Sequence, residues 1–477
     1  MKLFDKQSAQ LLERKVIKYE GPGFRLMARA ALETWKIAKK HSPRKIWAIA
    51  GPGNNGGDAI MTACFALLDR YDVSCSVLGQ PKGDALAALE FSKTIGLEIH
   101  KRLPNIKELK TGCDVLIDGV LGLGASRSPK GRLLGAINFI NEVRAKKKVF
   151  VISIDLPSGL DPCSGQVLGQ SAVKADETIM LLSPKQACYT GHASKHVGTL
   201  FFSDLGITNY HKYGTKTSEL IKPNLFRIER IPKISHKGTN GSVLILGGWG
   251  NMQGAGFLAG LAAARTGVGK VFICTPNSKF RPMELIGIDS KLEDLKSCLK
   301  QVNVVVAGPG LNEKADEHLH LIWKSKLPLV LDAYGLRWLA QNNPPKRTTN
   351  WIGTPHHGET IELLGKYKTE SNRFVQLTLL NEIYGGQWIL KGPGTLVGPN
   401  PTYVNNFANG ILATAGTGDV LAGIAGGMIA HGYSKAGALA THIHSESARK
   451  IIAQKSSRLI ASDLLKNIGT VINELET

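Results

Sequence analysis

The sequence lacks the features of secreted, membrane-spanning and disulfide-stapled proteins. Its seven cysteines are odd in number and include no Cys-x-x-Cys pair, which argues against a disulfide framework or a cysteine zinc site. The first twenty residues alternate charged and apolar side chains and contain no apolar signal-peptide core. The longest uncharged stretch rich in glycine and alanine, Val420–Ser434, is shorter than the ~18 to 20 apolar residues that cross a bilayer. We therefore expect a cytoplasmic protein with no membrane partner.

Aromatic residues are scarce, and the excess of positive charge is not concentrated anywhere. The chain has 59 Lys and Arg against 38 Asp and Glu, a formal net charge of +21, which raises the prospect of a nucleic acid or polyphosphate partner. Residues 1–220 contribute +11 and the remainder +10, and the densest basic run is only Lys146–Lys148. A basic RNA-binding scaffold is one alternative, and a salt-dependent shift of RNA would support it. The chain has only 6% aromatic residues and no aromatic-rich binding motif, which counts against this alternative. We expect no nucleic-acid partner.

Length and periodicity predict two large α/β domains. The 477 residues are 43% hydrophobic, and short β-branched runs alternate with amphipathic stretches, as in βα units around a parallel sheet. A polar stretch without sustained period, Thr208–Lys237, contains Pro223 and Pro232 and predicts the boundary between residues 1–215 and residues 222–477. The halves share no repeated motif. The expected strands are Ile46–Ala50, Val73–Leu78, Val115–Asp118, Val149–Asp155 and Glu177–Leu182 in the first half, and Ser242–Leu246, Lys270–Cys274, Asn303–Ala307, Pro328–Asp332 and Trp388–Leu390 in the second.

The glycine-rich loop Gly51–Asp58 follows an expected strand and opens an expected helix. It contains Gly-x-Gly-x-x-Gly, which alone suggests a dinucleotide fold with a pyrophosphate at the helix N-terminus. The acidic residue expected about 20 positions later is absent, because Val77–Gln80 occupies that place, and this weakens the redox-cofactor interpretation. Asn54, Asn55 and Asp58 supply two amides and a carboxylate that can bind a polar ring or a cation while backbone amides hold phosphate. A purely structural glycine turn is the alternative.

Two further loops end neighbouring strands of the first half. They are Asp118–Arg127 and Ile154–Asp161, and loops at the carboxyl ends of parallel strands converge on one crevice. Together with Gly51–Asp58 they resemble the NAD(P)H-hydrate epimerase family, whose pattern is a GxGNNGGDG, a DALxGTG and a DxPSG loop. The resemblance runs from about Leu26 to Gly206 and implies a Rossmann-like three-layer sandwich.

Enzymes of that family interconvert the R and S epimers of NADH or NADPH that has gained water across the nicotinamide 5,6 double bond. The resemblance implies that Asp155 contacts the substrate and shuttles a proton while the C6 hydroxyl leaves and returns. It also implies a potassium ion held by Asn55, Asp118 and Ser158. The residues implied to bind the hydrated nucleotide, besides Asp155, are Asn54, Asn55, Gly56, Gly57, Asp58, Gly122, Leu123, Gly124, Ala125, Ser126, Arg127 and Ser128.

This half departs from the family pattern at three positions, Ala28, Ala59 and Leu123. The family has Glu, Gly and Thr there. Leu123 removes a hydroxyl beside the ligand, so we expect it to weaken epimerisation while the fold stays intact.

In the second half, the strongest loop is Ala415–Asp419, which we expect to precede an apolar helix over Val420–Ala430. Its amides can form an anion hole at the positive end of the helix dipole. The chain has no Walker A sequence, so phosphate binding would depend on this loop. Asp419 beside the anion hole can take a proton from an attacking hydroxyl during phosphoryl transfer, and an ordinary helix N-cap is the alternative role for this residue.

Accompanying loops make this half similar to the ribokinase-like family and, more narrowly, to the bacterial ADP-dependent NAD(P)H-hydrate dehydratases, from about His236 to Asp463. The resemblance implies a ribokinase-like α/β domain in which ADP, as co-substrate, phosphorylates the C6 hydroxyl before elimination, giving AMP and phosphate. Mg²⁺ is expected with the diphosphate. The residues implied to bind the hydrated nucleotide are Ala255, Gly310, His356 and Asp419, and those implied to bind the adenine nucleotide are Lys391, Gly392, Pro393, Gly394, Thr395 and Gly418.

This half departs from the family pattern at two positions. Tyr334 stands where the family has the second Asp of a strand-end DAD segment. Asn312 stands where the family has the last Gly of a GPGxG loop, which here is Gly308–Asn312. We expect them to alter substrate affinity and to leave Asp419 in place.

Several histidines and one serine lack the sequence surroundings of a zinc-ligand or hydrolase motif. His192 and His196 lack the Glu of a zincin motif, and we expect them at the surface. His442 and His444 are expected to pack in a helix. Ser158 lacks the Gly-x-Ser-x-Gly elbow of a serine hydrolase.

The two resemblances together predict a bifunctional NAD(P)H-hydrate repair enzyme, with the epimerase before the dehydratase. The main alternative is a ribokinase-like small-molecule kinase with a regulatory nucleotide-binding N-terminal domain, which would yield a stable phosphorylated product. We expect hydrated NADH or NADPH and ADP as ligands, and a homo-oligomer.

Overall fold

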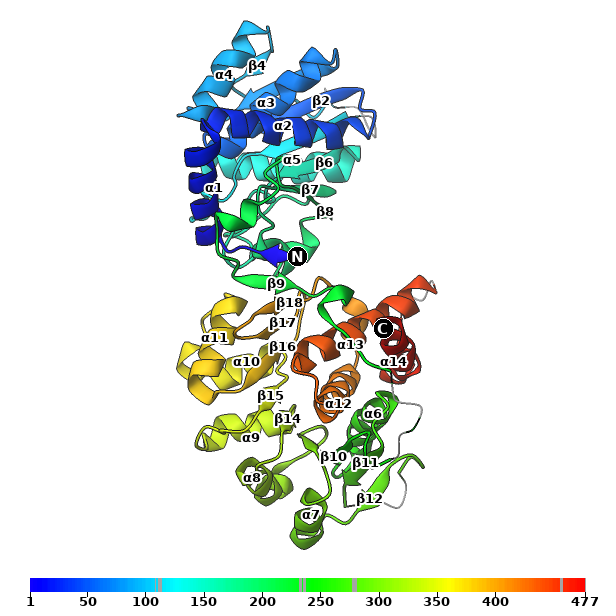
Figure 1. The fold of residues 1–477 in the computed structure, drawn as a ribbon. Helices are drawn as coiled ribbons and strands as arrows, with labels where there is room; N and C mark the ends of the chain where they lie inside the picture. The colour runs from blue at the N-terminus through cyan, green and yellow to red at the C-terminus, as the bar shows by residue number, and fades with distance from the viewer. Residues whose placement is uncertain are drawn as a thin grey trace. The chain divides into compact units, whose positions relative to one another are not determined.

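The chain forms two compact units, Lys2–Glu219 and Leu220–Thr477 with Met1 (Figure 1). The computed structural model describes residues 1–107, 109, 114–230, 234, 237–276, 281–454 and 458–476. The division lies inside the polar stretch Thr208–Lys237, and Ile221, Phe226 and Ile228 already belong to the core of the second unit. Pro232 of that stretch lies outside the described residues. Within those limits, no helix is both long and apolar enough to span a membrane.

The N-terminal unit is built on a parallel sheet with the strand order β4-β3-β2-β5-β6-β7-β8. Its strands are β2 (Lys45–Ala50), β3 (Asp72–Val77), β4 (Ile99–His100), β5 (Asp114–Gly119), β6 (Phe150–Ile154), β7 (Glu177–Leu181) and β8 (Thr199–Ser203). The predicted strands are present with ends shifted by at most one residue, and β4 and β8 are additional. A short antiparallel pair joins β1 (Lys2–Leu3) to β9 (Ser218–Leu220).

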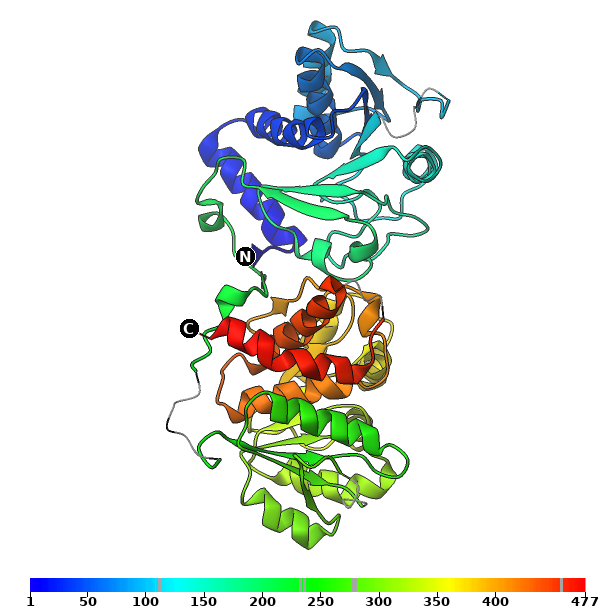
Figure 2. The ribbon, with the colours of Figure 1, turned by 90° about the vertical axis from the view of Figure 1, so that its right-hand side faces the viewer.

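Alternating side chains of these strands face two different cores, because the side-chain period of a strand is two. On β2, Ile46 and Ala48 belong to the core beneath the first helices, whereas Trp47 and Ile49 belong to the core beneath α5. The predicted three-layer sandwich is therefore confirmed, and Figure 2 shows α2 and α5 on opposite sides of the sheet. The helices are α1 (Lys6–Glu20), α2 (Gly23–Lys39), α3 (Asn54–Leu68), α4 (Asp84–Thr94) and α5 (Gly131–Lys147).

In the C-terminal unit, parallel strands run in the order β16-β15-β14-β13-β10-β11-β12, and β17 and β18 continue the sheet antiparallel beyond β16. The five predicted strands are present. The strand bounds are β10 (Ser242–Leu246), β11 (Lys270–Cys274), β12 (Ile286–Ile288), β13 (Val304–Ala307), β14 (Leu329–Leu331), β15 (Trp351–Gly353), β16 (Gln387–Leu390), β17 (Leu396–Gly398) and β18 (Tyr403–Val404).

Two different kinds of core cover the faces of this sheet. One face packs aliphatic residues of α6, α12, α13 and α14 against valines and isoleucines of the strands. Elsewhere in the unit, a chain of indoles joins Trp323, Trp351 and Trp388 at centroid distances of 5.2 and 5.0 Å. The helices are α6 (Gln253–Arg265), α7 (Leu292–Leu299), α8 (Asp316–Lys324), α9 (Tyr334–Asn342), α10 (His357–Leu364), α11 (Arg373–Tyr384), α12 (Thr417–Ala430), α13 (Ala436–Ala453) and α14 (Ala461–Leu475).

The close approach of α12 to α6 depends on Gly423. A Cβ at this position would lie 2.1 Å from the carbonyl oxygen of Ala259, a backbone atom that cannot move alone. We expect Gly423→Ala to destabilise the C-terminal unit by about 1 to 3 kcal/mol, as overpacking does. Urea unfolding followed by tryptophan fluorescence measures this change.

The matched control is Gly469→Ala in α14, where a Cβ meets nothing within 4 Å. Removing a glycine from an open helix interior is expected to stabilise by about 0.5 to 1 kcal/mol. Equal effects of the two substitutions would contradict the packing argument.

Candidate functional site

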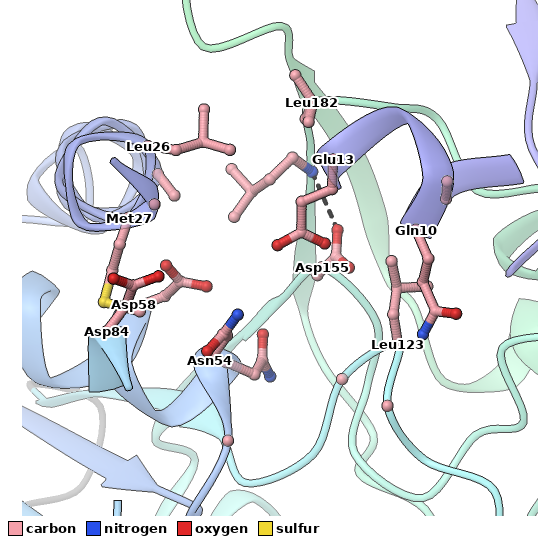
Figure 3. Close-up of a pocket in the computed structure, with 18 of the residues that line it drawn as sticks. Gln10, Glu13, Leu26, Met27, Asn54, Asp58, Asp84, Leu123, Asp155 and Leu182 are labelled. Carbon is pink, nitrogen blue, oxygen red and sulfur yellow. Dashed lines mark hydrogen bonds between the residues drawn. The ribbon is translucent and has the colours of Figure 1, made fainter. Parts of the chain in front are cut away.

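The three predicted loops of the N-terminal unit meet around a cavity of about 480 Å³ (Figure 3). They follow β2, β5 and β6, whose carboxyl ends lie at the same edge of the sheet. The helix α3 begins at Asn54, so its positive end meets the cavity. The predicted binding residues that line the cavity are Asn54, Asn55, Asp58, Gly122, Leu123, Gly124, Ala125 and Asp155.

The other predicted residues of these loops lie elsewhere. Gly56 and Gly57 are buried within the turn, where a Cβ on Gly56 would lie 1.9 Å from the Gly51 carbonyl oxygen and one on Gly57 would lie 2.5 Å from Met27. Gly56 therefore permits the close approach of α3 to the loop before it, and Gly57 permits its close approach to α2. Ser126, Arg127 and Ser128 are exposed and are not part of the cavity wall.

Of the three residues predicted to hold potassium, Asn55 and Ser158 bond to the backbone of Leu121, and Asp118 is joined to them through Ser158. Asp118 is fully buried, and its carboxylate accepts hydrogen bonds from Ser158 Oγ at 2.6 Å and from Ser153 Oγ at 2.7 Å. Ser158 Oγ also accepts from Leu121 N at 2.7 Å, and Asn55 Nδ2 donates to the Leu121 carbonyl at 2.7 Å. Burial raises the pKa of Asp118, and these hydrogen bonds oppose that effect.

Asp155 forms a buried ion pair that the sequence did not predict. The residue has a left-handed φ of +64°, and its carboxylate pairs with the ammonium of Lys185 and accepts from Leu181 N at 3.2 Å. The Lys185 side chain is only 3% exposed. Lys185 follows β7, the neighbour of β6, so the adjacency of these strand ends is the signal that would have found it.

Two more acidic residues missed by the sequence analysis, Glu13 of α1 and Asp84 of α4, line the same cavity. Burial and the neighbouring Asp155 raise the pKa of Glu13. Burial, with Glu13 and Asp155 nearby, also raises the pKa of Asp58. Neither Glu13 nor Asp84 belongs to a motif, and only the tertiary fold brings them to the loops.

In the C-terminal unit, Asp419 lies in the first turn of α12. The helix begins at Thr417, three residues before the predicted start, and its N-cap is Gly416 with a φ of +88°. Asp419 is therefore not the N-cap, and that alternative role is excluded. Burial, and then the carboxylate of Asp332, raise the pKa of Asp419 to about 7.

Lys391, one of the predicted adenine-nucleotide residues, lies near Asp419 and among other carboxylates. Its Nζ lies 2.8 Å from Asp332 Oδ1 and 3.9 Å from Glu359 Oε2, and a Cβ on Gly418 would lie 3.1 Å from it. Burial alone would lower the pKa of Lys391, but the two carboxylates outweigh it and raise the pKa. Asp332 follows β14 and Glu359 lies in the first turn of α10, and neither residue was predicted to belong to the site.

The predicted dehydratase-substrate residues have different surroundings. Ala255 and Gly310 are neighbours, because a Cβ on Gly310 would lie 3.0 Å from that of Ala255. The His356 side chain is exposed and caps α10, accepting from Gly358 N at 3.0 Å and from Glu359 N at 3.3 Å.

Arg373 binds the loop of residues 391–395 through hydrogen bonds. It belongs to no motif and was not predicted as a site residue. Its guanidinium donates to the carbonyls of Pro393 at 2.6 Å, Gly394 at 2.8 Å and Leu390 at 2.7 Å. Burial lowers the pKa of Arg373 to about 10. Thr395 Oγ1 closes the loop with a bond to the Gly392 carbonyl at 3.1 Å.

The two departures of this half have local partners. The hydroxyl of Tyr334 donates to Asp316 Oδ1 at 3.0 Å, so it is bound to α8. Asn312 Oδ1 accepts from Lys314 N at 3.1 Å and caps a short helix. His236, where the resemblance begins, lies outside the described residues.

Of the four histidines to which the sequence analysis assigned no chemical role, three are buried and one is exposed. His192 is exposed as expected, but His196 is buried and bonded to the Val173 carbonyl at 2.9 Å, so its predicted surface position was wrong. His442 and His444 are buried in α13 as predicted, and burial lowers the pKa of each to about 4. Over the described part of the chain, no group of three or more His, Cys, Asp or Glu side chains is arranged to hold a metal ion.

Comparison with known proteins covers both halves. A family profile described as NAD(P)H-hydrate dehydratase matches residues 243–470, and one described as YjeF-related protein N-terminus matches residues 23–187. The bifunctional NAD(P)H-hydrate repair enzyme Nnr of Coxiella burnetii is 33% identical over 99% of both chains. The protein of the same name from Escherichia coli is 30% identical over 94% of this chain and 90% of its own.

A solved structure also resembles the C-terminal half. The crystal structure of a ribokinase-like superfamily protein from Enterococcus faecalis is 22% identical, covers 55% of this chain and 97% of its own, and has a TM-score of 0.50. The ribokinase-like α/β fold predicted for this half is thereby confirmed.

The role of Arg373 can be tested without a ligand. Arg373→Lys keeps the positive charge but loses the planar fork that reaches several carbonyls at once. We expect faster amide hydrogen exchange over residues 390–396 by about tenfold or more, since each lost hydrogen bond contributes about 1 kcal/mol. Mass spectrometry of peptides covering the loop measures this.

Arg347→Lys is the control, because Arg347 is also a buried arginine bonded to carbonyls, among them Ile322 at 2.8 Å, but at the end of α8. It should leave exchange in the 390–396 loop unchanged. Unaltered exchange there in the Arg373 variant would show that the loop holds its shape without the arginine.

Proposed function

The chain belongs to the family of bifunctional NAD(P)H-hydrate repair enzymes, and from this premise we propose how its two units divide the work. The N-terminal unit, residues 1–215, epimerises the R and S hydrates of NADH and NADPH. The C-terminal unit, residues 222–477, dehydrates the S hydrate with ADP. The observation that carries this proposal is that each unit gathers its family-motif residues around a lysine, Asp155 with the buried Lys185 and Asp419 beside the half-buried Lys391.

In the epimerase site we propose that Asp155 contacts the hydrated ring and that α3 faces the phosphates. A helix N-terminus binds anions through its amides and dipole. Leu123 stands in the cavity wall, so an apolar side chain replaces a hydroxyl where the ligand would lie. We keep the expectation that this slows epimerisation without disturbing the fold.

A potassium ion fits the residues Asn55, Asp118 and Ser158. They bring an amide, a carboxylate and a hydroxyl to one place beside the Leu121 carbonyl, and hard cations prefer oxygen ligands. A bound cation would balance the negative charge of the buried Asp118 carboxylate. Asp118 and Ser158 also hold the loop after β5 against the loop after β6.

In the dehydratase site we propose that the Asp419 carboxylate takes the proton from the C6 hydroxyl as that oxygen attacks the β-phosphoryl group of ADP. The amides of Gly416–Gly418 and the Lys391 ammonium face the transferred group. AMP leaves, and loss of phosphate from C6 together with a proton from C5 to water then restores the 5,6 double bond. His356, Ala255 and Gly310 complete the proposed substrate site.

Mg²⁺ fits here as an ion that arrives with the nucleotide. Such sites hold Mg²⁺ through one or two carboxylates and the substrate phosphates. Asp332 and Glu359 supply two carboxylates beside Lys391. The ion would neutralise charge on the diphosphate.

The remaining parts of the proposal are finer than the family relationship. We propose ADP as the phosphoryl donor, a cytoplasmic location, a homo-oligomeric state, and no nucleic-acid or membrane partner. The small-molecule kinase is the weaker alternative, because full-length relatives that share both halves are named as repair enzymes.

The central test is recovery of absorbance at 340 nm from mixed R and S hydrates with ADP. We expect full recovery from the native protein, none from Asp419→Asn, and recovery of the S share only from Asp155→Asn. Accumulation of a stable phosphorylated hydrate, without recovery, would support the kinase alternative instead.

The Asp419 carboxyl also predicts a pH dependence. Its pKa is raised to about 7, and only the ionised form accepts a proton, so kcat for dehydration should rise with pH through about 7 and then level. Asp332→Asn removes a negative charge that raises this pKa, so the rising limb should move to lower pH. Glu474→Gln, at the exposed surface of α14, should leave the limb in place.

A further inference from the structure

We propose that Glu13 of α1 is a second catalytic carboxyl of the epimerase cavity, the acid that protonates the departing C6 hydroxyl. Asp155 remains the ionised partner of Lys185. This inference rests on the proposed epimerase function of the N-terminal unit and assigns a residue that lies outside every motif described above.

The helix α1 holds Glu13 rigidly at the cavity. Asp5 caps the helix by accepting from Ser8 N at 2.7 Å, and Leu12 and Val16 are fully buried beneath it. Ala9 and Ile17, four residues before and after Glu13, line the cavity with it, so one face of the helix forms part of the wall.

Figure 3 shows the carboxyl of Glu13 directed into the cavity, with Asp155 and Asn54 as its neighbours. The Asn54 side chain lies on the same side of the cavity and favours the ionised form of Glu13, which lowers the pKa of that carboxyl. Glu13 thus faces the space that Asp155 and the start of α3 enclose, where the hydrated ring is proposed to lie.

The cavity has more carboxyl groups than cations to balance them. Glu13, Asp58, Asp84 and Asp155 line the cavity from four different elements, whereas the one ammonium among the lining residues, that of Lys185, is already paired with Asp155. A buried carboxyl near another negative charge binds its proton more tightly, as a general acid must. Burial and Asp155 raise the pKa of Glu13, whereas Lys185 and Asn54 oppose the rise.

Asp58 is the other carboxyl with a raised pKa, but its position differs. In Figure 3 it lies with Asp84 and Met27 on the far side of the cavity from Asp155. Glu13 is the carboxyl beside Asp155, so it is the one placed to exchange a proton where Asp155 contacts the ring.

The proposed step balances without any co-reactant except water. The Glu13 proton moves to the C6 hydroxyl oxygen, the C6–O bond breaks with its electron pair leaving on water, and the N1 lone pair forms the C6–N1 double bond. Water then adds to the opposite face of C6, and the proton that it loses returns to the Glu13 carboxylate.

The test compares Glu13→Gln with Glu20→Gln, the same substitution at an exposed position of the same helix. Interconversion of purified R hydrate is followed by chromatography in the absence of ADP, so that dehydration cannot occur. We expect a fall of about 10²-fold or more for Glu13→Gln, as for removal of a general acid, and none for Glu20→Gln. The rate of A340 recovery from S hydrate with ADP should be unchanged, which shows that the effect is confined to the N-terminal unit.

A pH profile separates proton transfer from a packing role. Native epimerisation should decline as pH rises and Glu13 ionises. Glu13→Asp should keep a declining limb at reduced rate, and Glu13→Gln should lose the limb.

Two results would overturn the assignment. One is an equal rate of epimerisation in the Glu13→Gln and Glu20→Gln variants, and the other is a limb that persists in Glu13→Gln but disappears in Asp58→Asn. Failure of the native protein to interconvert the epimers is a different outcome, because it overturns the proposed epimerase function itself.

Discussion

Each unit of this protein is organised around a lysine, buried in the first unit and half-buried in the second, with more carboxylates nearby than it can neutralise. Lys185 pairs with Asp155 in a cavity that also contains Glu13, Asp58 and Asp84. Burying such charges costs several kcal/mol per ion unless they are paired and hydrogen-bonded. Burial and neighbouring carboxylates raise the pKa values of Glu13 and Asp58, so these two hold protons more tightly than carboxyls in water do, which is the property that acid–base catalysis needs.

The second unit repeats this arrangement on a different sheet. Lys391 lies 2.8 Å from Asp332, and the charges of Asp332 and Glu359 act on Asp419 as well. Lys391 is paired with Asp332, and Asp419, without such a partner at hydrogen-bond distance among the described residues, has a pKa of about 7. The close approach of Lys391 to α12 depends on Gly418, where even a methyl group would crowd the ammonium.

The sequence predicted the parts of both sites that follow strands and contain glycine. The loops after β2, β5 and β6, and the residues Gly416–Asp419 at the start of α12, each have a short local pattern that can be recognised in the sequence. Lys185, Glu13 and Arg373 could not be found in this way, because each reaches its site from an element distant in sequence. Strand adjacency would have pointed to Lys185, but the position of Glu13 depends on how α1 packs, and no periodicity records that.

The distribution of charge also constrains how a dinucleotide would lie in the N-terminal cavity. The formal net charge of +21 is spread along the chain and draws anions from a distance, but the cavity wall beside Asp155 is acidic. Phosphates would be repelled from Glu13 and Asp155 and favoured at the start of α3 and the glycines of the loop after β5. On the proposed function, the uncharged hydrated ring therefore takes the acidic end of the cavity, which is where proton transfer to its hydroxyl is required.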